Sequence, residues 1–185
     1  LDLIAGLPYE DYNRFAKSFN DVYNFQADKI QLGFLKLLKG SAIEDDAREY
    51  DYIYQAKAPY QVLANHVITY DELIKLEQIA KLVNRYYNTH IIEETLAYTI
   101  REIFYGNAFA LFASLADYWQ ENGLFYVGHR RDREYSLMKA FIKTNFPNHA
   151  KKINETLKYD YFKHNKSYHL PDQLSTDESI NVDGI

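Results

Sequence analysis

The chain has 185 residues, 47% of them hydrophobic and 16% aromatic, which excludes a wholly disordered protein and suits one domain with, at most, part of another. It has no cysteine, which excludes disulfides, thiolate zinc sites and ligation of an iron–sulfur cluster by this chain itself. The net charge is −5, no apolar run approaches the roughly 20 residues that cross a bilayer and no signal peptide pattern is present, so we expect a cytoplasmic protein without a membrane partner.

The first 40 residues alternate between strand and helix patterns. Residues 1–5 read as a short apolar strand that ends at a glycine turn before Pro8, and apolar spacing predicts a helix over 9–24. Residues 29–35 are a second strand candidate. This order predicts a βαβ unit with parallel strands and a right-handed crossover. Because parallel strands need neighbours and cover on both faces, we interpret the chain as the C-terminal piece of a larger α/β enzyme.

Residues 41–68 are expected to be a connector, with a short charged helix over 41–50 and an extended stretch over 59–67. Thr69 and Glu72 then form a capping box, in which each side chain accepts a hydrogen bond from the other residue's backbone N–H. This pattern predicts that a helical domain begins at Thr69.

The remaining chain is predicted to form a bundle of about five helices, over residues 69–88, 91–105, 107–123, 132–145 and 147–162. Asn107 is expected to cap the third helix, and Pro147 suits the first turn of the last one. The predicted fold class is therefore mainly α. The expected domain ranges are 1–40 for the βα part, 41–68 for the connector, 69–170 for the helical domain and 171–185 for a flexible tail.

Asp2 and the turn over 6–8 form the first candidate site. Ligands of parallel α/β sheets and barrels bind at the carboxyl ends of the strands. We therefore expect Asp2 and Gly33 to lie near the carboxyl ends of the two strands, where a carboxylate can accept hydrogen bonds from a ribose or an ammonium group. The alternative is that Asp2 is an ordinary terminal residue and residues 6–8 are merely a turn.

Two motifs carry a family resemblance. Residues 2–10, Asp-Leu-Ile-Ala-Gly-Leu-Pro-Tyr-Glu, resemble a late barrel strand of radical S-adenosylmethionine (SAM) enzymes, in the coproporphyrinogen oxidase branch and its cobalamin-binding relatives. Residues 31–41, Gln-Leu-Gly-Phe-Leu-Lys-Leu-Leu-Lys-Gly-Ser, look like the next barrel strand in cobalamin-binding radical SAM proteins that carry a helical C-terminal domain of unknown function. Residues 18–20 and 160–166 also resemble that group, often labelled magnesium-protoporphyrin ester cyclase-like, so the resemblance covers nearly the whole chain.

The resemblance implies a cofactor-binding role for three residues. Asp2 matches the position that contacts bound SAM in the porphyrinogen oxidase branch, and Gly33 and Phe34 lie on the following strand, where they could flank the cofactor. The resemblance also implies SAM, a [4Fe–4S] cluster and cobalamin in the parent protein, an oxidoreductase or methyltransferase. Its partners within that protein are the remainder of the barrel and a cobalamin-binding domain. The cluster-binding cysteine motif is absent here, so we expect neither catalytic residues nor activity in this chain alone.

A basic segment supplies the second candidate site. Residues 129–166 hold ten Lys or Arg against four Asp or Glu. Within it, Arg130, Arg131 and Arg133 could clamp a phosphate or carboxylate, and cations at a helix N-terminus are not explained by helix stability. The alternative is a basic loop paired with acidic residues such as Glu134. This segment supports a second hypothesis for function, a non-catalytic helical module that binds a protein or an anionic ligand, whereas we do not expect nucleic acid as a partner.

Two further features bear on partners and metals. Exposed strand edges have unpaired backbone groups that can pair with another strand, so we expect these strands either to form a homodimer or to be covered. His90, Glu93 and Glu94 share one helical face, but no second such set is present, so no metal site is expected. Seven of the 18 tyrosines recur at helical spacing and are interpreted as core residues with polar edges: Tyr86, Tyr87, Tyr98, Tyr105, Tyr118, Tyr159 and Tyr161.

Overall fold

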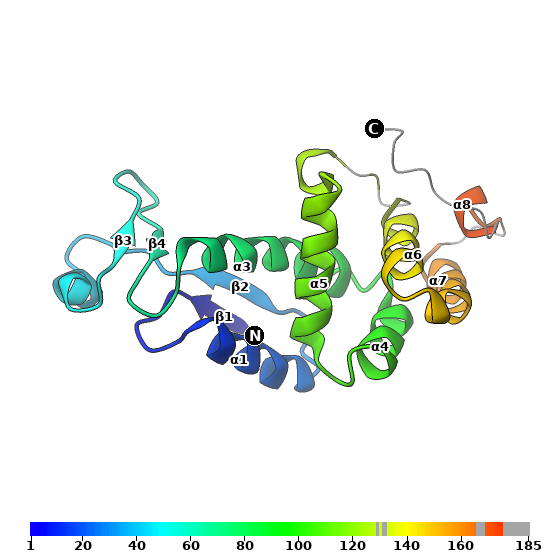
Figure 1. Cartoon of the computed structure of the whole chain (residues 1–185), viewed down its shortest axis with the longest axis horizontal. Helices are drawn as coiled ribbons and strands as arrows, with labels where there is room; N and C mark the ends of the chain where they lie inside the picture. Colours follow the sequence, from blue (N-terminus) through cyan, green and yellow to red (C-terminus); the bar gives the residue numbers. More distant parts are fainter. Residues whose placement is uncertain (129, 131–132, 166–168, 176–185) are drawn as a thin grey trace. The chain divides into compact units, whose positions relative to one another are not determined.

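The computed structural model describes residues 1–128, 130, 133–165 and 169–175. Within these ranges the chain is mainly helical and has two small sheets of two strands each, which confirms the predicted fold class (Figure 1). The chain divides into two compact units, residues 1–81 and 82–185. The domain ranges expected from the sequence stay a prediction.

The first unit begins with a βαβ arrangement. Strands β1 (Asp2–Ala5) and β2 (Gln31–Phe34) pair in parallel, as predicted, and helix α1 (Tyr12–Asn24) connects them. The helix begins later than expected because Asp11 is its N-cap and accepts a hydrogen bond from the Arg14 N–H at 2.8 Å.

The two strands present one face to the core and leave the other open. Ala5 and Leu32 are buried, whereas Asp2, Ile4 and Gln31 on the alternate positions are exposed. Helix α1 contacts β1 and contributes two fully buried side chains to this core, Phe15 and Phe19. Side-chain alternation thus leaves a strand face that can contact a ligand or another part of a protein.

The segment after β2 contains a hairpin that the sequence did not predict. Strand β4 (Val62–Ala64) lies in the stretch expected to be extended, and it pairs antiparallel with β3 (Ile53–Tyr54), which lies in the expected connector. The strands have only three and two residues, too few for a recognisable alternation. Between β2 and the hairpin, the expected charged helix consists of α2 (Ala42–Asp45) and a 3₁₀ turn, Asp46–Arg48.

The predicted capping box at the start of α3 (Tyr70–Leu82) is confirmed. The Thr69 N–H donates to Glu72 Oε2 at 2.8 Å, and the Glu72 N–H donates to Thr69 Oγ1 at 3.3 Å. A π-helical segment, Val83–Tyr87, follows directly, so the helical stretch reaches Asn88 as expected.

The second unit is helical throughout its described part, with helices α4 (Glu93–Glu102), α5 (Ala108–Glu121), α6 (Arg133–Asn145), α7 (Ala150–His164) and α8 (Asp172–Ser175) and 3₁₀ turns Leu124–Tyr126 and Pro147–His149. Asn107 caps α5 as predicted, because its Oδ1 accepts from the Ala110 N–H at 2.9 Å. Helix α7 packs against α4 and α6. Helix α8 lies in the range expected to be flexible, but its Leu174 is fully buried, so this part of the range belongs to the packed unit.

A buried carboxylate from α7 caps the start of helix α4. Asp160 of α7 is fully buried and accepts hydrogen bonds from the Glu94 N–H at 3.1 Å, the Thr95 N–H at 2.9 Å and Thr95 Oγ1 at 2.7 Å. The residue before the helix, Ile92, has no side chain that could cap it. Asp160 therefore satisfies N–H groups that a helix otherwise leaves without an acceptor.

Removal of this carboxylate should destabilise the second unit. We expect Asp160→Ala to lower the free energy of unfolding by about 2 to 4 kcal/mol, because it leaves buried donors without an acceptor. Urea unfolding followed by the fluorescence of Trp119, the chain's single tryptophan, reports on this unit. Glu155→Ala, which removes an exposed carboxylate from the same helix, is the control and should cost less than about 0.5 kcal/mol. Equal losses in the two variants would contradict the capping role.

The same residue predicts a pH dependence. Burial raises the pKa of the Asp160 carboxyl above its ordinary 3.8, and the hydrogen bonds from Thr95 and Glu94 oppose part of this effect. The folded protein binds the Asp160 proton more tightly than the unfolded chain does. The stabilisation that results from this tighter binding is fully present below about pH 4 and is lost as the pH rises through the folded pKa.

The difference in unfolding free energy between the wild type and Asp160→Asn should therefore decrease from about pH 4 to about pH 7. Lys163 lowers the pKa of Glu93, which gives the opposite dependence, but Glu93 is present in both proteins and cancels in the difference. Urea titrations at several pH values measure this difference. A free-energy difference that increases with pH would contradict the predicted direction.

Candidate functional site

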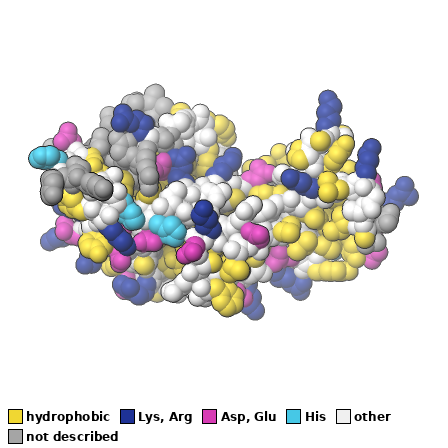
Figure 2. All heavy atoms as spheres, turned by 180° about the vertical axis from the view of Figure 1, so that it is seen from behind, with side chains coloured by type: hydrophobic (Ala, Val, Ile, Leu, Met, Phe, Trp, Pro, Cys, Tyr) yellow, Lys and Arg dark blue, Asp and Glu magenta, His cyan; other side chains and the backbone are white. Residues whose placement is uncertain are grey.

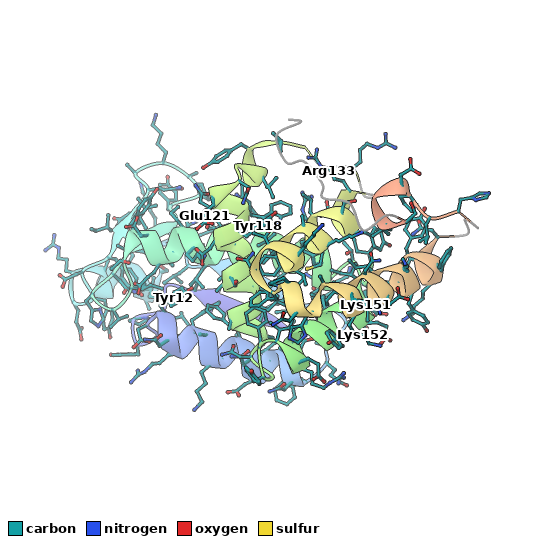
Figure 3. All side chains as sticks on the ribbon, turned by 45° about the vertical axis from the view of Figure 1, so that its right-hand side comes forward. Tyr12, Tyr118, Glu121, Arg133, Lys151 and Lys152 are labelled. Atoms are coloured by element: carbon teal, nitrogen blue, oxygen red, sulfur yellow. The ribbon has the colours of Figure 1, made fainter. Side chains whose placement is uncertain are left out.

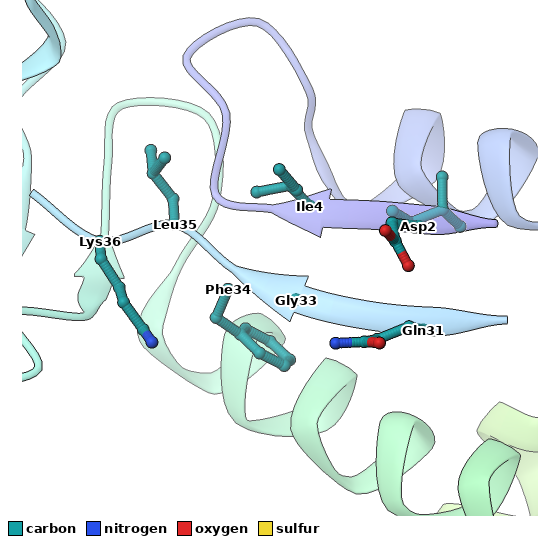
Figure 4. A pocket seen from close by; sticks show the side chains of 8 residues that line it. Asp2, Ile4, Gln31, Gly33, Phe34, Leu35 and Lys36 are labelled. Carbon is teal, nitrogen blue, oxygen red and sulfur yellow. The ribbon is translucent and has the colours of Figure 1, made fainter.

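An open pocket of about 360 Å³ lies along the β1–β2 pair. Figure 4 shows Asp2 and Gln31 side by side at one end of the strands and Leu35 and Lys36 at the other end. The residues that line it are Asp2, Leu3, Ile4, Gln31, Gly33, Phe34, Leu35 and Lys36. The structure thus brings together Asp2, Gly33 and Phe34, the three residues that the sequence analysis selected for cofactor binding.

The parallel register explains why Asp2 and Gly33 meet, whereas Phe34 pairs with the buried Ala5 and follows the other set of positions. Asp2 pairs with Gln31, and Ile4 pairs with Gly33, so their side-chain positions share one face of the sheet. Gly33 leaves space on this face, since an added Cβ would lie 3.6 Å from the Leu3 carbonyl oxygen, an ordinary contact distance.

The position of Asp2 along its strand differs from the expectation. Asp2 is the first residue of β1, so it lies at the amino end of the strand, and the expected carboxyl-end placement is wrong. Gly33 lies one residue from the carboxyl end of β2. The strand pattern of the sequence did not fix where pairing begins, because residues 1–5 are apolar at most positions whichever residue starts the strand.

The pocket has groups for polar and for flat ligands. The Asp2 carboxylate can accept hydrogen bonds from hydroxyl or ammonium groups, the Gln31 amide can donate and accept, and the half-buried Phe34 ring offers an apolar surface. Lys36 adds a positive charge beyond the end of β2. Sequence reasoning missed Gln31 and Lys36, and the parallel register was the signal that could have found Gln31.

The turn that follows β1 is held by two buried side chains. Tyr52 Oη donates to the Gly6 carbonyl oxygen at 3.0 Å. Asn65 Nδ2 lies 3.1 Å from the Gly6 carbonyl oxygen and 3.3 Å from that of Leu7. Burial raises the pKa of the Tyr52 phenol above 10.0, so this hydroxyl keeps its proton at neutral pH and acts as a donor. These contacts fix the carboxyl end of β1, where ligands of parallel sheets commonly bind.

The arginine site expected after residue 129 is not assembled by the described residues. Arg131 lies outside them, Arg130 is exposed, and Arg133 begins α6 (Figure 3). Glu134, which the alternative interpretation paired with these arginines, is buried and forms an ion pair with Arg85. Anion binding by the three arginines stays a prediction.

The other basic residues of the second unit are distributed among acidic ones. Lys163 Nζ lies 2.7 Å from Glu93 Oε2, and Lys158 Nζ lies 3.3 Å from Glu155 Oε1. Lysine and arginine side chains are spread over the face drawn in Figure 2 and do not merge into one continuous area there. This arrangement gives no specific support to binding of a polyanion.

His90 precedes α4 with a φ of +59°, so the expectation that it shares a helical face with Glu93 and Glu94 is wrong. His90 Nδ1 lies 2.9 Å from Glu93 Oε1. In the described ranges, His, Asp and Glu side chains do not come together in groups of three or more that could hold a metal ion. Helices in the same ranges are too short or too polar to cross a membrane.

A glycine on the pocket face and a glycine in the turn after β1 should differ in how much stability is lost when each is replaced by alanine. We expect Gly33→Ala to change the free energy of unfolding by less than about 0.5 kcal/mol, because the added methyl group meets only ordinary contacts. Gly6 has a φ of +93°, so Gly6→Ala should lose about 1 to 2 kcal/mol. Urea unfolding monitored by circular dichroism measures both. Equal destabilisation by the two substitutions would contradict this assignment.

Comparison with known proteins gives one family. None of the curated proteins that we compared matches the chain. A family model matches residues 48–183, a range that includes Tyr52, Asn65 and nearly all of the second unit. The match covers well over half of the sequence, and the chain therefore belongs to DUF4080, a family described as proteins of unknown function.

Proposed function

We propose that this chain is the C-terminal part of a radical SAM oxidoreductase or methyltransferase, in which β1 and β2 are late barrel strands. The larger protein would be cytoplasmic and would carry the [4Fe–4S] cluster and cobalamin. In this proposal the helical unit helps to shield the substrate from water, and the chain is not catalytic alone. The observation that carries the proposal is the parallel β1–β2 pair with a bare face and the motif Asp-Leu-Ile-Ala-Gly-Leu-Pro-Tyr-Glu on its first strand.

The edges of the pair support a larger sheet. Leu1 and Ala5 carbonyl oxygens accept from the Gln31 and Leu35 N–H groups, both at 2.9 Å. Because backbone groups alternate along a strand, the N–H and C=O groups of intervening residues point toward the outer edges. No third strand pairs with these edges in the described part of the chain.

We propose the rest of the barrel as the partner for these edges, since parallel strands are normally covered by neighbours and helices. A second copy of the chain is the other partner that the edges allow. Analytical ultracentrifugation separates these two partners, because only the second produces a dimer of the isolated chain.

The pocket residues suit part of a SAM molecule. The Asp2 carboxylate can accept hydrogen bonds from ribose hydroxyls or from the amino group, and Phe34 can pack against a flat or apolar part. Gly33 leaves room beside them. The chain has no cysteine and so supplies no ligand to a [4Fe–4S] cluster, and we assign no step of cluster or cobalamin chemistry to it. SAM bound to a reduced cluster supplies radical chemistry, and the residues here would bind and orient it.

The proposal predicts an activity of the larger protein that depends on Asp2. After anaerobic reconstitution with iron and sulfide, it should show cluster absorbance. With an added one-electron reductant such as dithionite, it should cleave SAM to methionine and 5′-deoxyadenosine, the 5′-deoxyadenosyl radical taking a hydrogen atom from substrate or solvent components. We expect Asp2→Ala to lower kcat/KM for SAM at least about tenfold, because a ligand contact made in the pocket is lost. Chromatographic detection of 5′-deoxyadenosine measures the rate.

Asp21→Ala is the matched control, because Asp21 is an exposed carboxylate on α1 that does not line the pocket. Its kcat/KM should equal that of the wild type. A folded protein that forms no cluster and cleaves no SAM would overturn the proposal. That result would favour the other hypothesis, a helical module that binds a protein or an anionic ligand.

A further inference from the structure

The carboxyl end of β1 is fixed by side chains that lie far along the sequence. Tyr52 and Asn65 are 46 and 59 residues from Gly6, whose carbonyl oxygen both of them contact. Tyr52 is 8% exposed and Asn65 is 9% exposed, so water has little access to replace these hydrogen bonds. Loss of either donor would leave a carbonyl oxygen poorly satisfied in a buried place.

Asn65 uses both ends of its side-chain amide. Its Nδ2 donates to the turn after β1, and its Oδ1 accepts from the backbone N–H groups of Val67 at 2.9 Å and Ile68 at 3.0 Å. A side chain with a donor and an acceptor is required, because the partners in the turn are the carbonyl oxygens of Gly6 and Leu7 and the other two partners are N–H groups. Asn65 therefore joins the turn to the segment that leads into α3.

The Gly6 turn lies beside Leu35, one of the residues that line the pocket. The Leu35 N–H donates to the Ala5 carbonyl oxygen at 2.9 Å, and the Val62 N–H donates to the Leu35 carbonyl oxygen at 2.8 Å. A Cβ on Gly6 would lie 3.5 Å from Leu35 Cβ and 3.5 Å from Val62 Cγ1. Since Leu35 lines the pocket, the Gly6 turn is packed against one of the residues at the carboxyl end of the pocket.

We infer that Tyr52 and Asn65 are positioning residues that hold the turn of Gly6 and Leu7 in the place required for ligand binding in the β1–β2 pocket. For the identity of that ligand, SAM, the inference rests on the proposed function. Both residues belong to the segment matched by the DUF4080 model, so the family domain itself supplies the groups that shape the strand ends.

The first part of the test measures the turn in the 185-residue chain. The variants are Tyr52→Phe, which removes only the hydroxyl, and Asn65→Asp, which keeps the acceptor for Val67 and Ile68 but replaces the donor by a second acceptor. The Glu10 N–H donates to the Leu7 carbonyl oxygen at 3.3 Å and reports on the turn by hydrogen exchange. We expect its exchange to become about tenfold faster in both variants, through local opening.

A reference amide distinguishes local from global effects. The Leu73 N–H, which donates to the Thr69 carbonyl oxygen at 3.1 Å in α3, should exchange at the wild-type rate. Unchanged exchange at Glu10, or equal acceleration at Glu10 and Leu73, would overturn the inference. The first result would show that the turn needs no clamp, and the second that the two residues stabilise the whole unit.

The second part measures SAM affinity by calorimetry in the larger protein with its cluster. Kd should rise about tenfold in Asn65→Asp and stay unchanged in Asn13→Asp, which makes the same chemical change at an exposed position of α1. Faster exchange with unchanged SAM affinity would reduce the pair to a structural role and overturn the inference. If the wild type does not bind SAM, the proposed function fails, and the exchange data alone then decide whether Tyr52 and Asn65 hold the turn.

Discussion

The parallel pairing of β1 with β2 is the constraint on which the rest of the first unit depends. Parallel strands cannot be joined by a tight turn, so a crossover is needed, and α1 provides it. Its two buried phenylalanines then cover one face of the strands, which leaves the alternate positions, among them Asp2 and Gln31, on the other face. The pocket is therefore a direct consequence of strand order and side-chain alternation. A local antiparallel hairpin of the same residues would not require a helix on one face only.

The family match and the compact units have different borders, because the first part of the matched segment packs on residues that precede the match. The match begins at residue 48, but residues 48–81 fold in one unit with the βαβ arrangement. Val62 is buried there, and it bonds to Leu35 of the strand segment. A polypeptide cut at residue 48 would lose this packing and would expose the polar ends of Tyr52 and Asn65 without their partners. The matched segment therefore needs the end of a strand such as β1 as its packing partner.

The features that could be predicted from the sequence are those encoded by neighbours in the chain. The Thr69–Glu72 box and the Asn107 cap each use residues three apart, and the apolar spacing of the long helices is equally local. The hairpin could not be predicted, because its strands are too short to alternate. Tyr52 and Asn65 could not be found either, because their role exists only through contacts with residues 46 to 59 positions away. Asp2, Gly33 and Phe34 were selected by resemblance. The parallel register, which a βαβ prediction implies without fixing, places Asp2 and Gly33 on one face of the sheet, whereas Phe34 pairs with the buried Ala5 and lines the pocket from the neighbouring position.

The two units share one device for fixing the end of an element. In the first unit, Asn65 satisfies carbonyl groups just beyond the end of β1, and in the second, Asp160 satisfies N–H groups at the start of α4. Apolar packing alone resists separation of elements but is not directional, so it permits small shifts along the contact. Buried hydrogen bonds are directional and costly to break, and they remove that freedom. A ligand pocket made from two short strands needs such restraint more than a helix bundle does, because a shift of its turn by one residue would exchange the two faces of the strand.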